Sequence, residues 1–110
     1  MIEDNPGDAR LILETLKDVR NVEISVEWVD ELKKGIDLIS GNRFDVLLLD
    51  LGLPDSEGYD TFVRAKEAAP GTPIILVTGL DDEMLAVKAV QNGAQDYLVK
   101  GEVDEKLLIK

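Results

Sequence analysis

The strongest constraint in this sequence is an unbroken apolar run at residues 46–49 (VLLL) that ends on the carboxylate of Asp50. A strand without apolar and polar alternation is typical of a sheet that helices cover on both faces. The next segment contains Gly52, Pro54 and Gly58, which favour a loop. Because open α/β sheets bind ligands at the carboxyl ends of their strands, Asp50 is the first candidate for a functional residue.

Strand and helix patterns alternate along the rest of the chain. Strands are expected at residues 1–2, 22–28, 46–49, 74–77 and 96–99, and helices at residues 6–20, 31–41, 59–69, 81–91 and 102–110. Asn5 and Asp30 stand where the first two helices need a cap. Residues 22–28 alternate apolar and acidic side chains, as edge strands do. We therefore predict an α/β fold, a doubly wound five-stranded parallel sheet in the order 2-1-3-4-5, in a flavodoxin-like three-layer α/β/α arrangement.

The length of 110 residues fits a single domain, residues 1–110, with one core. Residues 1–2 are short for a strand, and residues 102–110 are short for a helix that covers a sheet. We therefore expect this domain to be truncated at both ends.

The composition excludes several functional classes. The chain has no cysteine and no histidine, which rules out disulfides, thiolate and histidine metal sites, Ser-His triads and phosphohistidine carriers. Its formal net charge of -11 opposes direct binding to nucleic acid or to anionic lipid. No apolar segment approaches the roughly 20 residues that span a bilayer, and no signal segment opens the chain. We expect a cytoplasmic protein.

Polar residues follow four of the five predicted strands: Glu3 with Asp4, then Asp50, Thr78 and Lys100. Each one alone has a structural explanation as a turn, a solvated corner, a strand former or a surface charge. In a parallel sheet, however, these ends share one edge, so the side chains are expected to converge. Three carboxylates in one place repel each other, and Mg²⁺ would relieve the repulsion by binding one or two of them with a carbonyl and water.

Four motifs, IEDNP, LLLDLGLPDSEG, ILVTG and DYLVKG, occur in this order and spacing. Together they resemble the receiver domain of two-component response regulators over essentially the whole chain. The resemblance implies a signalling domain that takes a phosphoryl group from a histidine kinase or a phosphotransfer domain. Such a domain is not an enzyme beyond catalysing its own phosphorylation and dephosphorylation. The loop DLGLPDSEG and the ending YLVKG are similar to receivers within sensor kinases and other multidomain signalling proteins.

The resemblance also implies roles for individual residues. Asp50 would be the phosphoacceptor, and Mg²⁺ would be held by Glu3, Asp4, Asp50 and the backbone carbonyl of Gly52. A carboxylate can act as such a nucleophile, because phosphoryl transfer asks the protein mainly for positioning and charge neutralisation.

Three further residues would read out the phosphoryl group. Lys100 would bind it, Thr78 would be the switch hydroxyl and Tyr97 the switch aromatic. The face made by the fourth helix, the last strand and the fifth helix would then change and bind an output domain or a second receiver. Tyr97 has an alternative interpretation as an amphipathic cover for an edge, and Trp28 is either a packing residue or a partner contact.

The chain departs from the family pattern in two ways. Gly101 follows Lys100 where the family commonly has proline, often with a cis peptide bond. Without proline the cis form costs roughly 3 kcal/mol, so the resemblance does not establish whether this bond is cis or trans. Gly52 and Leu80, two positions past Asp50 and Thr78, cannot orient water by hydrogen bonding. We therefore expect slow self-dephosphorylation.

Three alternatives compete with this interpretation. A phosphohydrolase of the haloacid dehalogenase type also uses a strand-end aspartate, but it needs a second one where this chain has Gly52. A flavodoxin-type FMN carrier shares the strand order, but the acidic pair at residues 3–4 would repel the FMN phosphate. A receiver-like interaction module that is never phosphorylated stays open.

Overall fold

The computed structural model describes residues 1–18 and 24–100 of the chain. The described helices are α1 (Pro6–Lys17), α2 (Leu32–Gly41), α3 (Tyr59–Ala68) and α4 (Glu83–Gln91), with a 3₁₀ turn, η1 (Leu80–Asp82), before α4. The strands are β1 (Leu47–Asp50), β2 (Gly52–Leu53), β3 (Ser56–Glu57), β4 (Ile74–Thr78) and β5 (Asp96–Val99). The helix expected at residues 102–110 lies outside the described residues.

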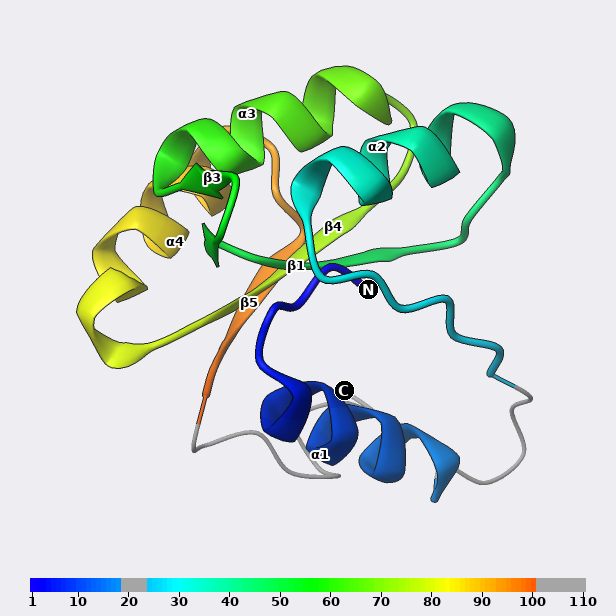
Figure 1. Ribbon diagram of the computed structural model, residues 1–110. Coiled ribbons are helices and arrows are strands. Elements are labelled where there is room, and N and C mark those ends of the chain that lie inside the picture. Colours follow the sequence, from blue (N-terminus) through cyan, green and yellow to red (C-terminus); the bar gives the residue numbers. More distant parts are fainter. Residues whose placement is uncertain (19–23, 101–110) are drawn as a thin grey trace.

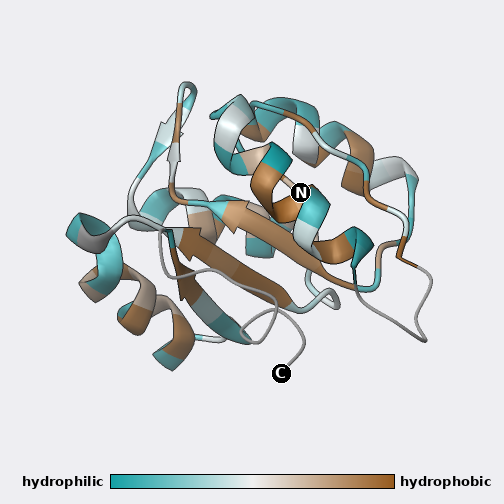
Figure 2. Ribbon diagram, turned by 90° about the horizontal axis from the view of Figure 1, so that it is seen from below, coloured by the Kyte–Doolittle hydropathy of each residue, from teal (hydrophilic) through white to brown (hydrophobic). Residues whose placement is uncertain are grey.

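The central sheet is parallel and runs in the order β1-β4-β5. Helices cover both faces of this sheet: α2, α3 and α4 lie on one face and α1 lies on the other (Figure 1). This arrangement explains the unbroken apolar runs of the strands. β1 and β4 are hydrophobic over most of their length, whereas β5 is hydrophilic at its amino end and hydrophobic at its carboxyl end (Figure 2). The predicted α/β class with a parallel sheet is confirmed.

The five-strand order 2-1-3-4-5 is not confirmed. Residues 24–28 form no strand, and residues 22–23 lie outside the described part of the chain. Instead, Ile2 forms isolated parallel bridges to Val29 on one side and to Leu49 on the other. Within the described part of the chain, the backbone of Glu27 and Val29 is hydrogen-bonded to Met1 and Glu3, which make a short partner for a strand. The short antiparallel β2-β3 hairpin was not predicted.

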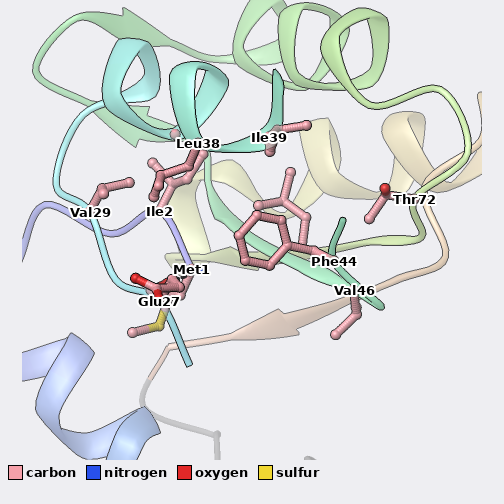
Figure 3. A pocket seen from close by; sticks show the side chains of 11 residues that line it. Met1, Ile2, Glu27, Val29, Leu38, Ile39, Phe44, Val46 and Thr72 are labelled. Atoms are coloured by element: carbon pink, nitrogen blue, oxygen red, sulfur yellow. Dashed lines mark hydrogen bonds between the residues drawn. The ribbon is translucent and has the colours of Figure 1, made fainter. Parts of the chain in front are cut away.

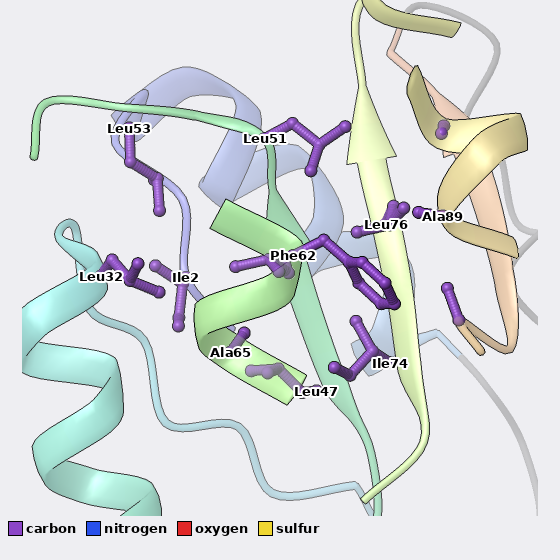
Figure 4. Close-up of a cluster of buried hydrophobic side chains, with 13 residues drawn as sticks. Ile2, Leu32, Leu47, Leu51, Leu53, Phe62, Ala65, Ile74, Leu76 and Ala89 are labelled. Atoms are coloured by element: carbon purple, nitrogen blue, oxygen red, sulfur yellow. The ribbon is translucent and has the colours of Figure 1, made fainter. Parts of the chain in front are cut away.

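One hydrophobic cluster fills the space between the sheet and the helices α2, α3 and α4 (Figure 4). Leu49 and Leu76 from the central strands are fully buried in it, as is Phe62 from α3. Burying such side chains stabilises a domain by roughly 1.5–3 kcal/mol each. The carboxyl ends of β1 and β4 are therefore held in fixed positions.

The helix starts agree with the sequence only in part. Asn5 caps α1 as predicted, since its side chain accepts a hydrogen bond from the Asp8 N–H at 3.1 Å, and Pro6 opens the helix. The cap predicted for the second helix is wrong. Asp30 binds Lys34 instead, and the carboxylate of Asp55 accepts hydrogen bonds from the first turn of α2.

A small apolar cavity lies at the amino ends of β1 and β4, away from Asp50 (Figure 3). Its volume of about 20 Å³ is close to that of one water molecule, so it cannot hold a larger ligand. Close packing explains the size: a Cβ atom on Gly35 of α2 would overlap the side chain of Ile2. Within the described residues, no helix is long and apolar enough to cross a membrane.

Candidate metal centre

The register of the sheet determines which strand ends meet. Asp50, the last residue of β1, pairs with Val77 of β4, so Thr78 stands one residue further along. Thr78 in turn pairs with Val99, the last residue of β5. The backbone N–H of Lys100 donates to the Thr78 carbonyl at 2.7 Å and extends this edge by one residue. The predicted convergence of strand ends is therefore present in the backbone.

The side chain of Lys100 joins three carboxylates. Its Nζ atom lies 2.9 Å from Oδ2 of Asp50 and 3.0 Å from Oε1 of Glu3. It also lies 3.0 Å from Oδ2 of Asp8. An ammonium group has three N–H donors, so three carboxylates saturate it. The sequence did not identify Asp8 as a site residue, although a signal was present: Asp8 lies in the first turn of α1, which begins at this same edge.

The acidic group fits a hard cation. Glu3, Asp4 and Asp50 each offer a carboxylate oxygen, and these oxygens lie within 4.8 Å of one another. Oε1 of Glu3 is buried and accepts no hydrogen bond from the described residues, although it is ion-paired with Lys100. Asp4 is exposed at the rim. Carboxylate oxygens suit Mg²⁺ better than they suit softer metals. A cation would also give the buried Oε1 of Glu3 a partner in addition to Lys100.

The loop after Asp50 folds back onto it. The backbone N–H of Gly52 donates to Oδ1 of Asp50 at 3.0 Å. A Cβ atom on Gly52 would meet nothing within 4 Å, so this part of the rim is open. The Gly52 carbonyl is a further oxygen at this edge that a cation could use.

Burial and mutual repulsion give the two buried acidic groups, Glu3 and Asp50, very different pKa values. Desolvation and the interaction with Asp50 raise the pKa of Glu3 to about 8. Desolvation alone would raise the pKa of Asp50 too, but interactions with Glu3, the Gly52 N–H and Lys100 together lower it. At neutral pH, Glu3 therefore holds a proton while Asp50 is ionised and available as a nucleophile or ligand.

Lys100 stays charged over the physiological range. Burial lowers its pKa, but the hydrogen bonds to Asp50, Glu3 and Asp8 outweigh that effect and raise it above the ordinary value. The structure therefore places a permanent positive charge beside Asp50.

The two predicted switch residues occupy neighbouring strands. Thr78 is completely buried, and its Oγ1 donates to the Gly79 carbonyl at 3.3 Å. Tyr97 on β5 is half-buried, and its hydroxyl donates to Oε2 of Glu83 at 2.9 Å. Thr78 thus lies at the edge that carries the carboxylates, whereas Tyr97 connects β5 to the start of α4.

Trp28 is hydrogen-bonded to the backbone of Glu3, one of the candidate metal ligands. Its Nε1–H donates to the Glu3 carbonyl at 2.8 Å, while the side chain stays 41% exposed. The packing interpretation of Trp28 thus has a contact to support it.

Comparisons with known proteins identify the family. The signal receiver domain of a LuxO repressor protein from Vibrio parahaemolyticus matches with a TM-score of 0.82 and 28% identity, over 98% of this chain and 80% of that one. Regulatory protein LuxO of Vibrio cholerae serotype O1 is 35% identical over 91% of this chain and 21% of its own length. Cell cycle transcriptional regulator CtrA of Caulobacter vibrioides is 34% identical over 91% of this chain and 42% of its own.

The chain spans less than half the length of these two relatives. The family model described as the response regulator receiver domain matches residues 1–110. This match sets aside the phosphohydrolase and flavodoxin alternatives, which are different families. The four motifs, the parallel sheet and the acidic edge agree with it, and the chain belongs to the response regulator receiver domain family.

Proposed function

We propose that this chain is a phosphoacceptor that receives a phosphoryl group on Asp50 from a phosphohistidine of a histidine kinase or phosphotransfer domain. One observation carries the proposal: the ionised Asp50 carboxylate lies 2.9 Å from the ammonium of Lys100, at an edge with two further acidic residues that suit a cation. Family membership supports it.

The transfer is a displacement at phosphorus. A carboxylate oxygen of Asp50 forms the new P–O bond, and the P–N bond to the donor imidazole breaks with its electron pair on the nitrogen, which then takes up a proton. Oδ2 is the favoured nucleophile, because a phosphoryl group on this oxygen would lie beside Lys100 Nζ, which would neutralise its charge. Asp50 needs no base, since its lowered pKa keeps it ionised at neutral pH.

Glu3, Asp4, Asp50 and the Gly52 carbonyl would hold Mg²⁺. When bound, Mg²⁺ supplies positive charge that neutralises the phosphoryl oxygens. Glu3 would give up its proton to become a ligand, and Lys100 would exchange part of its contact with Glu3 for the phosphoryl group. The buried Oε1 of Glu3, which accepts no hydrogen bond from the described residues, supports this assignment.

Thr78 and Tyr97 would convert phosphorylation into a change of surface. The Thr78 hydroxyl would leave the Gly79 carbonyl and donate to a phosphoryl oxygen, which would draw the loop before α4 inward. Tyr97 is bonded to Glu83 at the start of α4, so it would move with that loop. Met84 on α4 is 85% exposed, which suits a face that binds an output domain or a second receiver.

The wider context of the domain is also part of the proposal. We assign the segments around Val29 and Ile2 as the second and first strands of a sheet with the order 2-1-3-4-5. Ile2 bridges Val29 on one side and Leu49 of β1 on the other, both bridges are parallel, and β4 and β5 follow β1 in the sheet. The relatives are named a regulatory protein and a transcriptional regulator, and both are much longer than this chain. An output domain encoded beyond these residues would fit that pattern.

The test is phosphorylation of the purified protein with acetyl phosphate and Mg²⁺, with intact mass as the readout. We expect an adduct of one phosphoryl group that requires Mg²⁺ and is absent in Asp50→Asn. A protein that is folded by circular dichroism but gains no adduct, and that does not bind beryllofluoride either, would overturn the proposal. That result would favour the receiver-like interaction module.

A further inference from the structure

A second carboxylate in the loop after Asp50 makes an unexpected long-range contact. Oδ1 of Asp55 accepts a hydrogen bond from the Leu32 N–H at 2.8 Å, and Oδ2 accepts one from the Lys33 N–H at 2.9 Å. These are the first two residues of α2, and Glu31 at its N-cap makes no capping hydrogen bond with its side chain. Asp55 therefore caps a helix that begins 23 residues earlier in the chain.

Asp55 lies at the tip of a hairpin that starts at the candidate metal centre. In this hairpin, β2 pairs antiparallel with β3, which leaves Pro54 and Asp55 at the turn. Gly52, the first residue of the hairpin, donates its N–H to Oδ1 of Asp50. Three consecutive links thus join Asp50 to α2: the Gly52 hydrogen bond, the paired strands and the Asp55 cap.

The base of the hairpin is also fixed. The Gly58 N–H donates to the Leu51 carbonyl at 2.9 Å. Leu53 is buried in the same cluster as Leu32, the first residue of α2 (Figure 4). The hairpin is therefore connected to α2 in two ways, through the shared apolar cluster and through the Asp55 carboxylate at its tip.

We propose that Asp55 is a positioning residue for the metal centre: by fixing the hairpin tip to the amino end of α2, it holds Gly52 in place as a ligand. The inference rests on the proposed function, because Gly52 matters as a ligand only if the centre binds Mg²⁺. Asp55 itself does not touch the carboxylate cluster. Its effect passes through the backbone of the hairpin.

The charge of Asp55 suits this position. A carboxylate at a helix amino end interacts favourably with the helix dipole and with its free N–H groups. Although burial acts in the opposite direction, the hydrogen bonds from Lys33 and Leu32 lower the pKa of Asp55. The cap is thus present throughout the neutral range.

Thermodynamic linkage means that the coupling between the Asp55 cap and Mg²⁺ binding can be measured either as a change in Mg²⁺ affinity or as a change in the stability of the cap. If the cap raises the affinity for Mg²⁺ by some factor, then bound Mg²⁺ must stabilise the cap by the same factor. The contribution of a typical helix cap sets the expected size of the effect at about fivefold.

The experiment compares Mg²⁺ titrations of the wild type, Asp55→Ala, Asp55→Asn and Asp30→Ala by calorimetry. Asp30 is the matched control, because it lies at the same end of α2 and carries the same charge, but its side chain binds Lys34 and not the hairpin. We expect Asp55→Ala to weaken Mg²⁺ binding about threefold to fivefold, Asp55→Asn to weaken it less, and Asp30→Ala to leave it unchanged. Hydrogen exchange of the Leu32 and Lys33 amides should slow when Mg²⁺ binds the wild type.

Two results would overturn the inference. Unchanged Mg²⁺ affinity in both Asp55 variants would mean that Leu53 alone positions the hairpin and that the cap only stabilises α2. Equal weakening in Asp30→Ala would mean a general charge effect. A wild type that binds no Mg²⁺ would instead contradict the proposed function, so the two failures are distinguishable.

Discussion

The Nζ atom of Lys100 lies 2.9 Å from Oδ2 of Asp50, although the two residues are 50 positions apart in the chain. The parallel register of β1, β4 and β5 brings them together, because it places the ends of these strands on one edge. Lys100 also contacts Glu3 and Asp8, so one ammonium group binds three acidic side chains. The centre is short of positive charge, and its stability and affinities should depend on each of these groups.

Removal of Lys100 should destabilise the metal-free protein. Lys100→Met leaves Asp50 ionised and buried without its nearest cation, which costs several kcal/mol at fully buried sites. Because the Lys100 side chain is 24% exposed, we expect a smaller loss of about 2 kcal/mol in the free energy of unfolding. Urea denaturation with and without Mg²⁺ measures it, and Mg²⁺ should restore more stability to the variant than it adds to the wild type.

The control for this prediction is Lys34→Met. Lys34 pairs with Asp30 on the surface, where both side chains are more than half exposed, so its loss should cost well under 1 kcal/mol. Equal losses in the two variants would contradict the importance of the Lys100 contacts.

The stability of the metal-free protein should decrease between about pH 5 and pH 8. The pKa of Glu3 is raised from its ordinary value of 4.5 to about 8 in the folded protein, so the folded state binds more protons than the unfolded state in this interval. Stability from this group is complete below pH 4.5 and is lost as the pH rises through 8. Thermal unfolding midpoints measured across this range without Mg²⁺ test the prediction.

The variant Glu3→Gln distinguishes the pH dependence caused by Glu3 from that caused by other titratable groups. The variant cannot ionise at residue 3, so its midpoint should change less with pH than that of the wild type. The pKa of Asp50 is lowered from 3.8, so its influence falls at lower pH. The Met1 amino group, whose pKa is lowered by burial, contributes to both proteins alike. Identical pH profiles would refute the raised pKa of Glu3.

Asp8 should compete with a bound anion for Lys100. An anion at Asp50 needs an N–H of the same ammonium group and is repelled by the Asp8 carboxylate. Without Asp8, Lys100 keeps its contact with Asp50 and part of its contact with Glu3. We expect Asp8→Asn to bind beryllofluoride about threefold to tenfold more tightly in saturating Mg²⁺. Its unfolding free energy should change by only about 0.5 kcal/mol, because the side chain is 36% exposed.

Asp18→Asn is the matched control, since Asp18 lies at the other end of α1. It should leave beryllofluoride binding unchanged. Weaker binding by Asp8→Asn would show that Asp8 orients Lys100 and does not compete for it.

Periodicity along the backbone made the central sheet and its functional edge predictable. The unbroken apolar runs predicted buried parallel strands, and the polar residues at their ends predicted that Asp50, Thr78 and Lys100 share an edge. Side-chain contacts between distant elements were not predictable in this way. Asp8 and Asp55 look like ordinary acids of a first helical turn and of a loop, and only the folded chain shows which groups they meet. The first two expected strands are represented in the described residues only by the isolated bridges of Ile2 to Val29 and to Leu49, because strand formation depends on the length of the neighbour as well as on local pattern.

Polar side chains at residues 52 and 80 should shorten the life of the phosphorylated form. Gly52 is exposed, and a Cβ atom there would meet nothing within 4 Å, so Gly52→Asn should fold normally and could orient a water molecule toward the phosphoryl group. The side chain of Leu80 lies outside what the structure describes, and Leu80→Glu remains a prediction from sequence. We expect each variant to lose its phosphoryl adduct about tenfold faster than the wild type. This is less than the roughly 10²–10⁴-fold of a general base, because the new side chain would only orient water.

Intact mass measured over time after removal of acetyl phosphate gives the decay rates. Gly41→Asn is the matched control, because Gly41 is equally open but lies at the far end of α2, and its decay rate should equal that of the wild type. Unchanged decay in both Gly52→Asn and Leu80→Glu would show that these positions do not limit the attack of water. Faster decay in Gly41→Asn as well would point to a loosened fold, which circular dichroism of the same samples would detect.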